Sequence, residues 1–147
     1  MKFFICQCPD TKCFTCSFRI KNLKTMKYTI SDAILQLKPG ADYIIRGEDY
    51  SGLEWLDSSQ TKPTETEINS KISELDAVEA MRLLRIERTN RLIECDWTQF
   101  PDVPDATRTA WQTYRQQLRD LPASASPSLD SNYDLDLTSV TWPSKPS

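Results

Sequence analysis

A turn is predicted at Asp96-Trp97-Thr98-Gln99-Phe100-Pro101-Asp102-Val103-Pro104, between two segments with a helical pattern. Its two prolines interrupt helix formation, because proline lacks the backbone N–H and its ring clashes with the preceding turn. Three large apolar side chains in the same stretch indicate a packed connection and not a flexible linker. The sequence therefore predicts two helices joined by a compact turn.

The segment after this turn has the pattern of an amphipathic helix. Asp105 is a suitable residue to cap its start, and Pro122 prevents it from continuing. Apolar residues recur at spacings of three or four and form one stripe: Trp111, Tyr114, Leu118 and Leu121. Because the connection is short, we expect this helix to fold back on the preceding one as an antiparallel hairpin.

Aromatic side chains are expected to close the turn end of this hairpin. Trp97 and Phe100 should pack against Trp111 and Tyr114. Large amphipathic rings serve in cores and also at interfaces, so two roles are open, the hairpin core and partner binding. The candidate residues for these roles are Trp97, Phe100, Trp111, Tyr114, Arg115, Leu118, Arg119 and Trp142.

A long helix is predicted before the turn. Thr64 and Glu67 form the capping-box pattern T-x-x-E, and apolar residues then follow at spacings of three and four up to Trp97. From Thr64 to about Cys95 such a helix would measure roughly 48 Å. One short hairpin cannot cover so long a stripe, so we expect either a break near residues 76–80 or a partner helix.

Residues 26–62 are predicted to form a small αββ unit. Its helix, capped by Thr29 or Ser31, should stop at Pro39-Gly40. Two β-rich runs then follow and should pair as a hairpin. Side-chain alternation gives the expected cross-strand neighbours: Tyr43 and Ile45 with Leu53 and Trp55. A hairpin alone is marginally stable, so a helix or another chain must cover it.

The first 25 residues differ from the rest in charge and in cysteine content. Four cysteines fall close together in a C-x-C-x4-C-x2-C pattern: Cys6, Cys8, Cys13 and Cys16. A zinc knuckle uses short spacings of this kind, but its two cysteine pairs are usually about a dozen or more residues apart. We therefore favour a disordered extension or a misassigned start ahead of Met26 over a metal site.

Charge is distributed unevenly along the chain. Residues 1–27 carry six Lys or Arg side chains and one Asp, a net charge of +5. Since the whole chain carries −3, residues 28–147 carry −8. An acidic body does not attract a phosphate backbone, so we predict no nucleic-acid partner for it.

Composition also excludes several classes of function. The chain has no histidine, which removes imidazole bases and both Ser-His and Cys-His nucleophile systems. No apolar run approaches the roughly 18 to 20 residues that span a bilayer. We therefore predict neither an enzyme nor a membrane protein, and no cofactor.

An ordered set of motifs carries a resemblance to a known family. The motifs are Leu84-Arg85-Ile86-Glu87-Arg88, Asp96-Trp97-Thr98-Gln99, Trp111, Tyr114-Arg115, Leu118-Arg119-Asp120 and Val140-Thr141-Trp142-Pro143-Ser144-Lys145-Pro146. In this order they resemble the phage tail assembly chaperone family over about residues 82–147. Cys95 stands where that family usually has threonine, which leaves the helix end intact. Residues 26–75 more faintly resemble XkdW-like phage tail-region proteins.

The resemblance implies an accessory protein for phage tail or tail-fibre assembly that acts in the host bacterial cytoplasm. Its expected partner is a tail-fibre or other tail protein. Unassembled fibre chains are rich in β-strands and expose strand edges and apolar surface that aggregate. An aromatic helical hairpin could cover such surface and then dissociate once the partner assembles.

A structural component of the tail fibre or baseplate, retained in the virion, is the alternative. Ile68, Ile72 and Leu75 form a seam through which the long helix could oligomerise as a short stalk. Glu79 and Asn90 interrupt this seam with polar side chains and weaken the alternative.

The Ser/Pro-rich tail, residues 123–147, is expected to be extended. Its run 133–137 alternates polar and apolar residues, so it could add a strand to a partner or pack back on its own hairpin. Trp142 has the same two options, docking on the local core or anchoring a partner.

The predicted fold class is α+β: a small N-terminal helix plus β-hairpin, a long helix, then an antiparallel helical hairpin with an extended C-terminal tail. The expected domain boundaries are 1–25 for the extension, 26–62 for the αββ unit, 63–122 for the long helix with the hairpin, and 123–147 for the tail.

Overall fold

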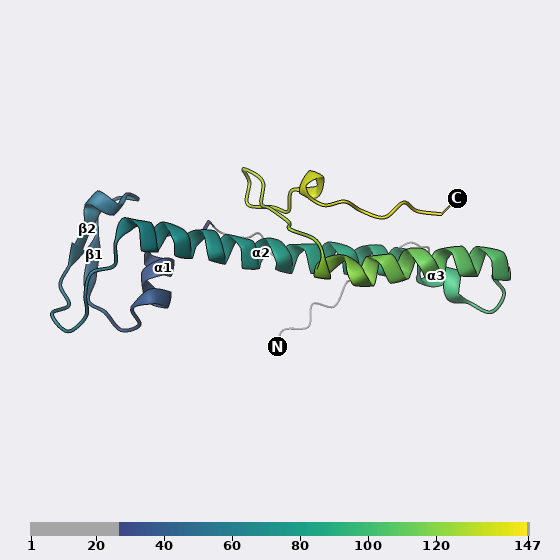
Figure 1. Ribbon diagram of the computed structural model, residues 1–147, viewed down its shortest axis with the longest axis horizontal. Coiled ribbons are helices and arrows are strands. Elements are labelled where there is room, and N and C mark those ends of the chain that lie inside the picture. Colours follow the sequence, from purple (N-terminus) through teal and green to yellow (C-terminus); the bar gives the residue numbers. More distant parts are fainter. Residues whose placement is uncertain (1–26, 147) are drawn as a thin grey trace, which may run out of the picture.

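A computed structural model describes residues 27–146 of the chain. The predictions for the N-terminal cysteines and for the extension fall outside these described residues. Helix α2 (Glu65–Glu94) forms the long axis of the molecule. The αββ unit lies at one end of it, and helix α3 (Asp105–Asp120) folds back beside the other end (Figure 1). The α+β class with a long helix is confirmed.

The αββ unit has the predicted order of elements and the predicted cross-strand neighbours. Helix α1 (Ile30–Leu37) starts with a capping box in which Thr29 and Asp32 exchange hydrogen bonds. Strands β1 (Tyr43–Ile45) and β2 (Leu53–Trp55) are antiparallel and are joined through the short 3-10 helix η1 (Tyr50–Gly52). Tyr43 lies opposite Trp55 and Ile45 opposite Leu53, as the alternation predicted.

The first core joins this unit to α2. Its buried members are Ala33, Ile34, Leu53 and Ile68. The hydroxyl of Tyr50 donates to the carbonyl of Pro63 at 2.9 Å, and the indole N–H of Trp55 donates to the carbonyl of Gln60 at 2.8 Å. These bonds fix the segment that leads into α2, so the hairpin is held against the start of the long helix.

Helix α2 has no break. It runs for 30 residues, about 45 Å, from the predicted capping box of Thr64 and Glu67. Of the two options left open by the sequence, the break near residues 76–80 is wrong. The partner helices come from the chain itself, because α1 packs on the N-terminal part of α2 and α3 on its C-terminal part.

The start of α3 differs from the prediction. Pro104, not Asp105, occupies the cap position, and it has no side chain able to cap. Its fixed φ of −53° and extended ψ of 139° lead the chain directly into the helix. Asp105 lies in the first turn instead, where it pairs with Arg108 and interacts favourably with the helix dipole.

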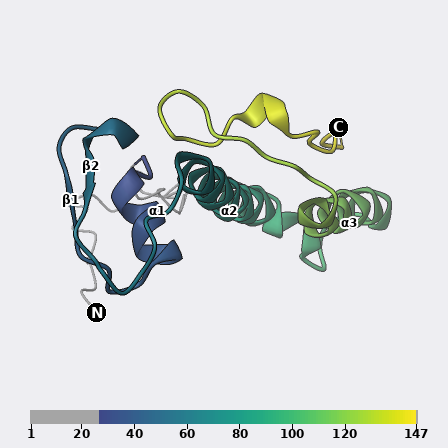
Figure 2. The same cartoon turned by 60° about the vertical axis from the view of Figure 1, so that its left-hand side comes forward.

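The tail packs back on its own chain, one of the two options left open. After the 3-10 helix η3 (Leu121–Ala123), a loop closes through an antiparallel bridge between Leu129 and Leu135. A second 3-10 helix, η4 (Leu137–Ser139), follows, and the chain then continues extended. Figure 2 shows this tail, in yellow, along one side of the long helix.

Candidate partner-binding site

Three aromatic rings connect the turn to α3. The 3-10 helix η2 (Asp96–Gln99) directly follows α2 and carries Trp97. The ring centroids of Trp97 and Trp111 lie 6.0 Å apart, and those of Trp111 and Tyr114 lie 5.6 Å apart at a right angle. Edge-to-face and tilted pairs at such distances are favourable for aromatic rings. The predicted packing of Trp97 against Trp111 is therefore present.

Arg115 fastens the end of α2 to α3. One guanidinium nitrogen donates to the carbonyl of Leu92 at 2.9 Å and to the sulfur of Cys95 at 3.2 Å, and it lies 2.8 Å from the carboxylate of Asp96. Burial by itself would lower the pKa of Arg115, but the bonds with Asp96 and Cys95 outweigh it and raise the pKa above its ordinary value. The cation therefore adds a charged donor to a helix-end carbonyl that also accepts from the backbone N–H of Cys95.

Replacing Arg115 with methionine is expected to lower the free energy of unfolding by about 2 kcal/mol, because a charge-assisted hydrogen bond from a mostly buried side chain is lost. Methionine keeps the apolar stem and removes the charge. Asp96→Asn should cost no more than about 0.5 kcal/mol, since that carboxylate is exposed. Urea unfolding followed by circular dichroism measures both, and equal costs would contradict this assignment.

Residues 140–146, called here the C-terminal strap, return to the same end of α2. Trp142 packs on the second core, whose buried members are Cys95, Tyr114 and Leu118. The guanidinium carbon of Arg91 lies 3.8 Å from the centroid of the Trp142 ring, a cation–π contact. Val140 is also buried. The local-core option for Trp142 is thus the arrangement in this structure.

Three large apolar side chains remain exposed at this end of the molecule. Ile93, Trp97 and Phe100, called here the apolar tip, are 39%, 52% and 59% exposed. They are spaced four and three residues apart across the end of α2, η2 and the turn. Exposed apolar side chains gathered in this way are typical of protein interaction sites.

The predicted site residues thus separate into two sets. Tyr114 and Leu118 are buried, while Trp111, Arg115 and Trp142 are half-buried around them. Trp97, Phe100 and Arg119 are exposed. Phe100 does not close the core as expected, because its side chain is 59% exposed, just before the first proline of the turn. No contact of its ring with another aromatic ring is found within residues 27–146.

Sequence reasoning missed two groups that complete this site. Arg91 is not among the residues that the sequence singles out, yet its guanidinium covers the Trp142 ring. Cys95 is buried as a free thiol and accepts from Arg115. The sequence marks Cys95 only as a departure from the threonine that is usual in the family. That departure does not predict that the thiol is buried.

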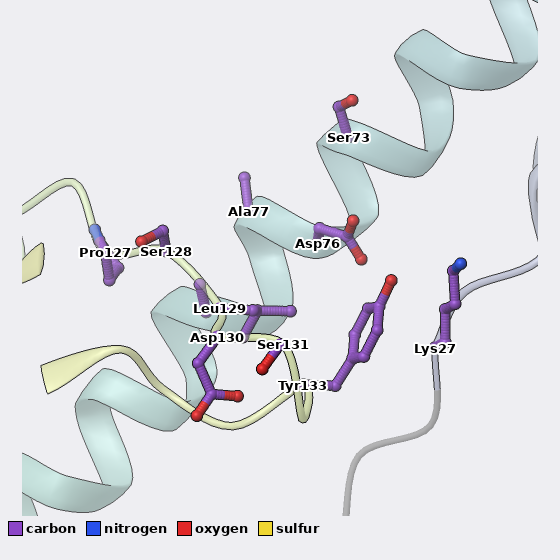
Figure 3. A pocket seen from close by; sticks show the side chains of 11 residues that line it. Lys27, Ser73, Asp76, Ala77, Pro127, Ser128, Leu129, Asp130, Ser131 and Tyr133 are labelled. Carbon is purple, nitrogen blue, oxygen red and sulfur yellow. The ribbon is translucent and has the colours of Figure 1, made fainter.

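A cavity of about 580 Å³ lies farther along α2, under the tail loop. Figure 3 shows the Tyr133 ring extending from this loop toward α2, with Asp76 on the helix side and Lys27 across from it. One carboxylate oxygen of Asp76 is buried without a hydrogen-bond partner within the described part of the chain. Burial raises the pKa of Asp76, and the nearby Lys27 offsets part of this rise.

Asp76→Asn is expected to raise stability at pH 7. A carboxyl whose pKa is higher in the folded state than in the unfolded state stabilises the fold only below its unfolded pKa, near 3.8, and this contribution is lost as pH rises through the folded value. The gain from the substitution should therefore shrink as the pH falls through the raised pKa of Asp76 and be largely absent below about 3.8. Melting temperatures at pH 3.5 and pH 7 test this, and a gain independent of pH would contradict it.

These features together define the class: an elongated helical-hairpin protein with an exposed aromatic surface suited to contact with other proteins. Residues 81–147, a little under half of the chain, match the model of the family described as phage tail assembly chaperone protein. This match confirms the resemblance that the sequence motifs carry over that part of the chain. It does not reach residues 26–75, whose XkdW-like resemblance stays a prediction. No curated protein and no solved structure was found to match the chain.

Residues 27–146 show no sign of a membrane-spanning helix or of a metal site. No helix among them combines the length and apolar character needed to cross a membrane. No cluster of three or more Cys, Asp or Glu side chains in that range is arranged to hold a metal ion. The four cysteines at positions 6–16 lie outside it.

Proposed function

We propose that this protein binds a tail-fibre or other tail structural protein of a bacteriophage during virion assembly, and that the apolar tip is the docking surface. The family match over residues 81–147 supports the chaperone role. The observation that carries the assignment of the surface is the exposure of Trp97 and Phe100 on a turn that is itself firmly held. Such a role requires no catalysis and is exercised in the host cytoplasm, where tail proteins are synthesised.

The turn presents the tip in a fixed geometry. Thr98 is fully buried between the two exposed aromatic residues. Its hydroxyl donates to the backbone carbonyl of Cys95 at 2.7 Å and accepts from the side-chain amide of Gln99 at 2.8 Å. Side chains fixed before binding lose little conformational entropy when a partner docks. The turn that carries Trp97 and Phe100 is therefore organised before any partner arrives.

The properties of the tip also suit temporary binding. Three apolar side chains form a small contact by the standards of permanent assemblies, which bury several thousand Å². Aromatic residues at the centre of a small interface supply most of its affinity. Binding of this kind protects an unassembled client and still permits release when the client's own subunits associate.

The alternative, a structural component retained in the virion, is weakened because the same chain already covers most of the seam that it would need. Ile68 is buried and Ile72 half-buried against α1 and the hairpin of the same chain. A stalk made by α2 would need these side chains for contacts with other copies, so α1 would first have to leave. Mass spectrometry of purified virions tests this alternative, since a retained component would be present in whole-number ratio to the fibre.

Co-expression with each tail and fibre gene of the same phage genome, followed by affinity capture of this chain, tests the proposed function. We expect one tail structural protein to be captured and to become more soluble in the presence of this chain. Failure of every tail protein to bind, in extracts where each is expressed, would overturn the proposal.

A further inference from the structure

The strap occupies a position that α2 and α3 form without it. The Trp142 ring lies on Cys95, Tyr114 and Leu118, with Arg91 over its face, and this set of four residues is called here the Trp142 seat. Tyr114 and Leu118 come from α3, Arg91 comes from the last turn of α2, and Cys95 directly follows it. The seat is thus built from the helical hairpin, and the strap is its occupant.

Side chains alone hold the strap. No backbone hydrogen bond joins residues 140–146 to α2 or α3 within the described chain. Lys145 pairs with Glu94 at 3.2 Å, but both side chains are about half exposed, and such pairs add little. The indole of Trp142 and the buried Val140 therefore provide most of the attachment.

The contact between strap and seat is also imperfect. The indole N–H of Trp142 and the hydroxyl of Tyr114 are both buried without a hydrogen-bond partner in residues 27–146. A buried polar group that lacks a partner opposes the burial that creates it. Docking of the strap thus leaves two donors unsatisfied, which favours any occupant that supplies an acceptor.

We propose that the strap is a displaceable internal ligand, and that an extended client segment replaces it in the Trp142 seat. This inference rests on the proposed function and names the partner chemistry for it. The strap itself shows what the seat accepts: an aromatic ring for Arg91 to cover, followed by proline, with a lysine three residues after the ring to reach Glu94.

A client segment of this kind could form a hydrogen bond in the seat that the strap does not form. Backbone carbonyls of an extended chain, or an Asn or Gln next to its aromatic residue, can accept from the Tyr114 hydroxyl. The strap competes from within the same chain at a high effective concentration. It therefore covers the seat in the free protein and withholds it from weak, unspecific apolar segments.

The test uses a fluorescent synthetic peptide with the sequence of residues 138–147 and the full-length chain carrying Trp142→Ala, which keeps the tail but empties the seat. We expect the peptide to bind this variant at least about tenfold more tightly than it binds the wild-type chain, whose strap competes. Thr141→Ala, at an exposed position, is the matched control and should behave as wild type. A peptide whose own tryptophan is replaced by alanine should bind neither.

Hydrogen exchange of the wild-type chain provides a readout that needs no variant, which matters if Trp142→Ala does not fold. Backbone amides of residues 140–146 should exchange much faster than those of residues 110–118. Slow exchange of the strap, or equal peptide binding by wild type and a folded Trp142→Ala variant, would overturn the inference. If client capture survives while peptide exchange fails, the proposed function stands and the strap mechanism alone is wrong.

Discussion

Replacing Tyr114 with alanine is expected to lower the free energy of unfolding by about 3–5 kcal/mol, as for other large aromatic residues removed from a core. Tyr114 is 2% exposed and lies between Trp111, whose ring it meets edge to face, and the strap-covered second core. No neighbouring element is free to collapse into the space, because Arg115 ties α3 to the end of α2. Urea unfolding followed by circular dichroism measures the loss.

Two further variants separate the contribution of the Tyr114 ring from that of its hydroxyl and from that of the neighbouring Trp111. Tyr114→Phe should be neutral or slightly stabilising, because the hydroxyl that it removes has no hydrogen-bond partner within residues 27–146. Trp111→Ala should cost less than Tyr114→Ala, because the Trp111 ring is only half-buried. A large loss for Tyr114→Phe would show that the hydroxyl is bonded, and an unchanged midpoint for Tyr114→Ala would show that the second core contributes no stability.

Local signals in the sequence predicted most of the secondary structure. The T-x-x-E pattern at Thr64 and Glu67 specifies a helix start whose two hydrogen bonds lie within four residues. In the β-hairpin, side-chain alternation over two short runs predicts which residues share a face, and the observed cross-strand neighbours agree. In both places the interactions that decide the structure lie close together in the sequence, so the pattern of residues is sufficient.

Contacts between distant segments were not predictable in the same way. Arg91 and Trp142 meet across about fifty residues, and nothing in the spacing of arginines identifies which of them faces the tail. The apolar period of α2 likewise shows which side chains share a face but not what covers that face. For this reason the sequence leaves open a break or a partner helix, and the structure shows that α1 and α3 of the same chain cover the stripe.

The site illustrates the same limit. The spacing of Tyr114 and Leu118 identified them as an apolar stripe, and both are buried. Trp97 and Phe100 are equally apolar, yet both remain exposed. Hydrophobicity alone does not distinguish a core residue from a docking residue, because the difference lies in whether the folded chain leaves the side chain a place to pack. The exposed tip can thus contribute to docking without contributing to the core, whereas the buried stripe is required for the fold.

That separation leads to the second large effect, expected for Phe100→Ala. The affinity for the tail client should fall by about 30-fold or more, the loss typical of a hot-spot aromatic residue at about 2 kcal/mol. The stability of the free protein should change by no more than about 0.5 kcal/mol, since the side chain is 59% exposed and leaves no cavity. Trp97→Ala should also reduce binding, with a modest loss of stability from its contact with Trp111.

Leu35→Ala provides a matched control, because Leu35 is also 59% exposed but lies on α1, at the opposite end of α2. Titration of each variant with the captured client, by calorimetry, gives the affinities. If Leu35→Ala weakens binding and Phe100→Ala does not, the client docks on the αββ unit and the apolar tip has been assigned wrongly. If Phe100→Ala lowers the affinity while its melting curve matches that of the wild-type chain, the exposed ring contributes to client binding and not to stability. A substitution that leaves the free protein unchanged can lower the affinity only through contacts made in the complex.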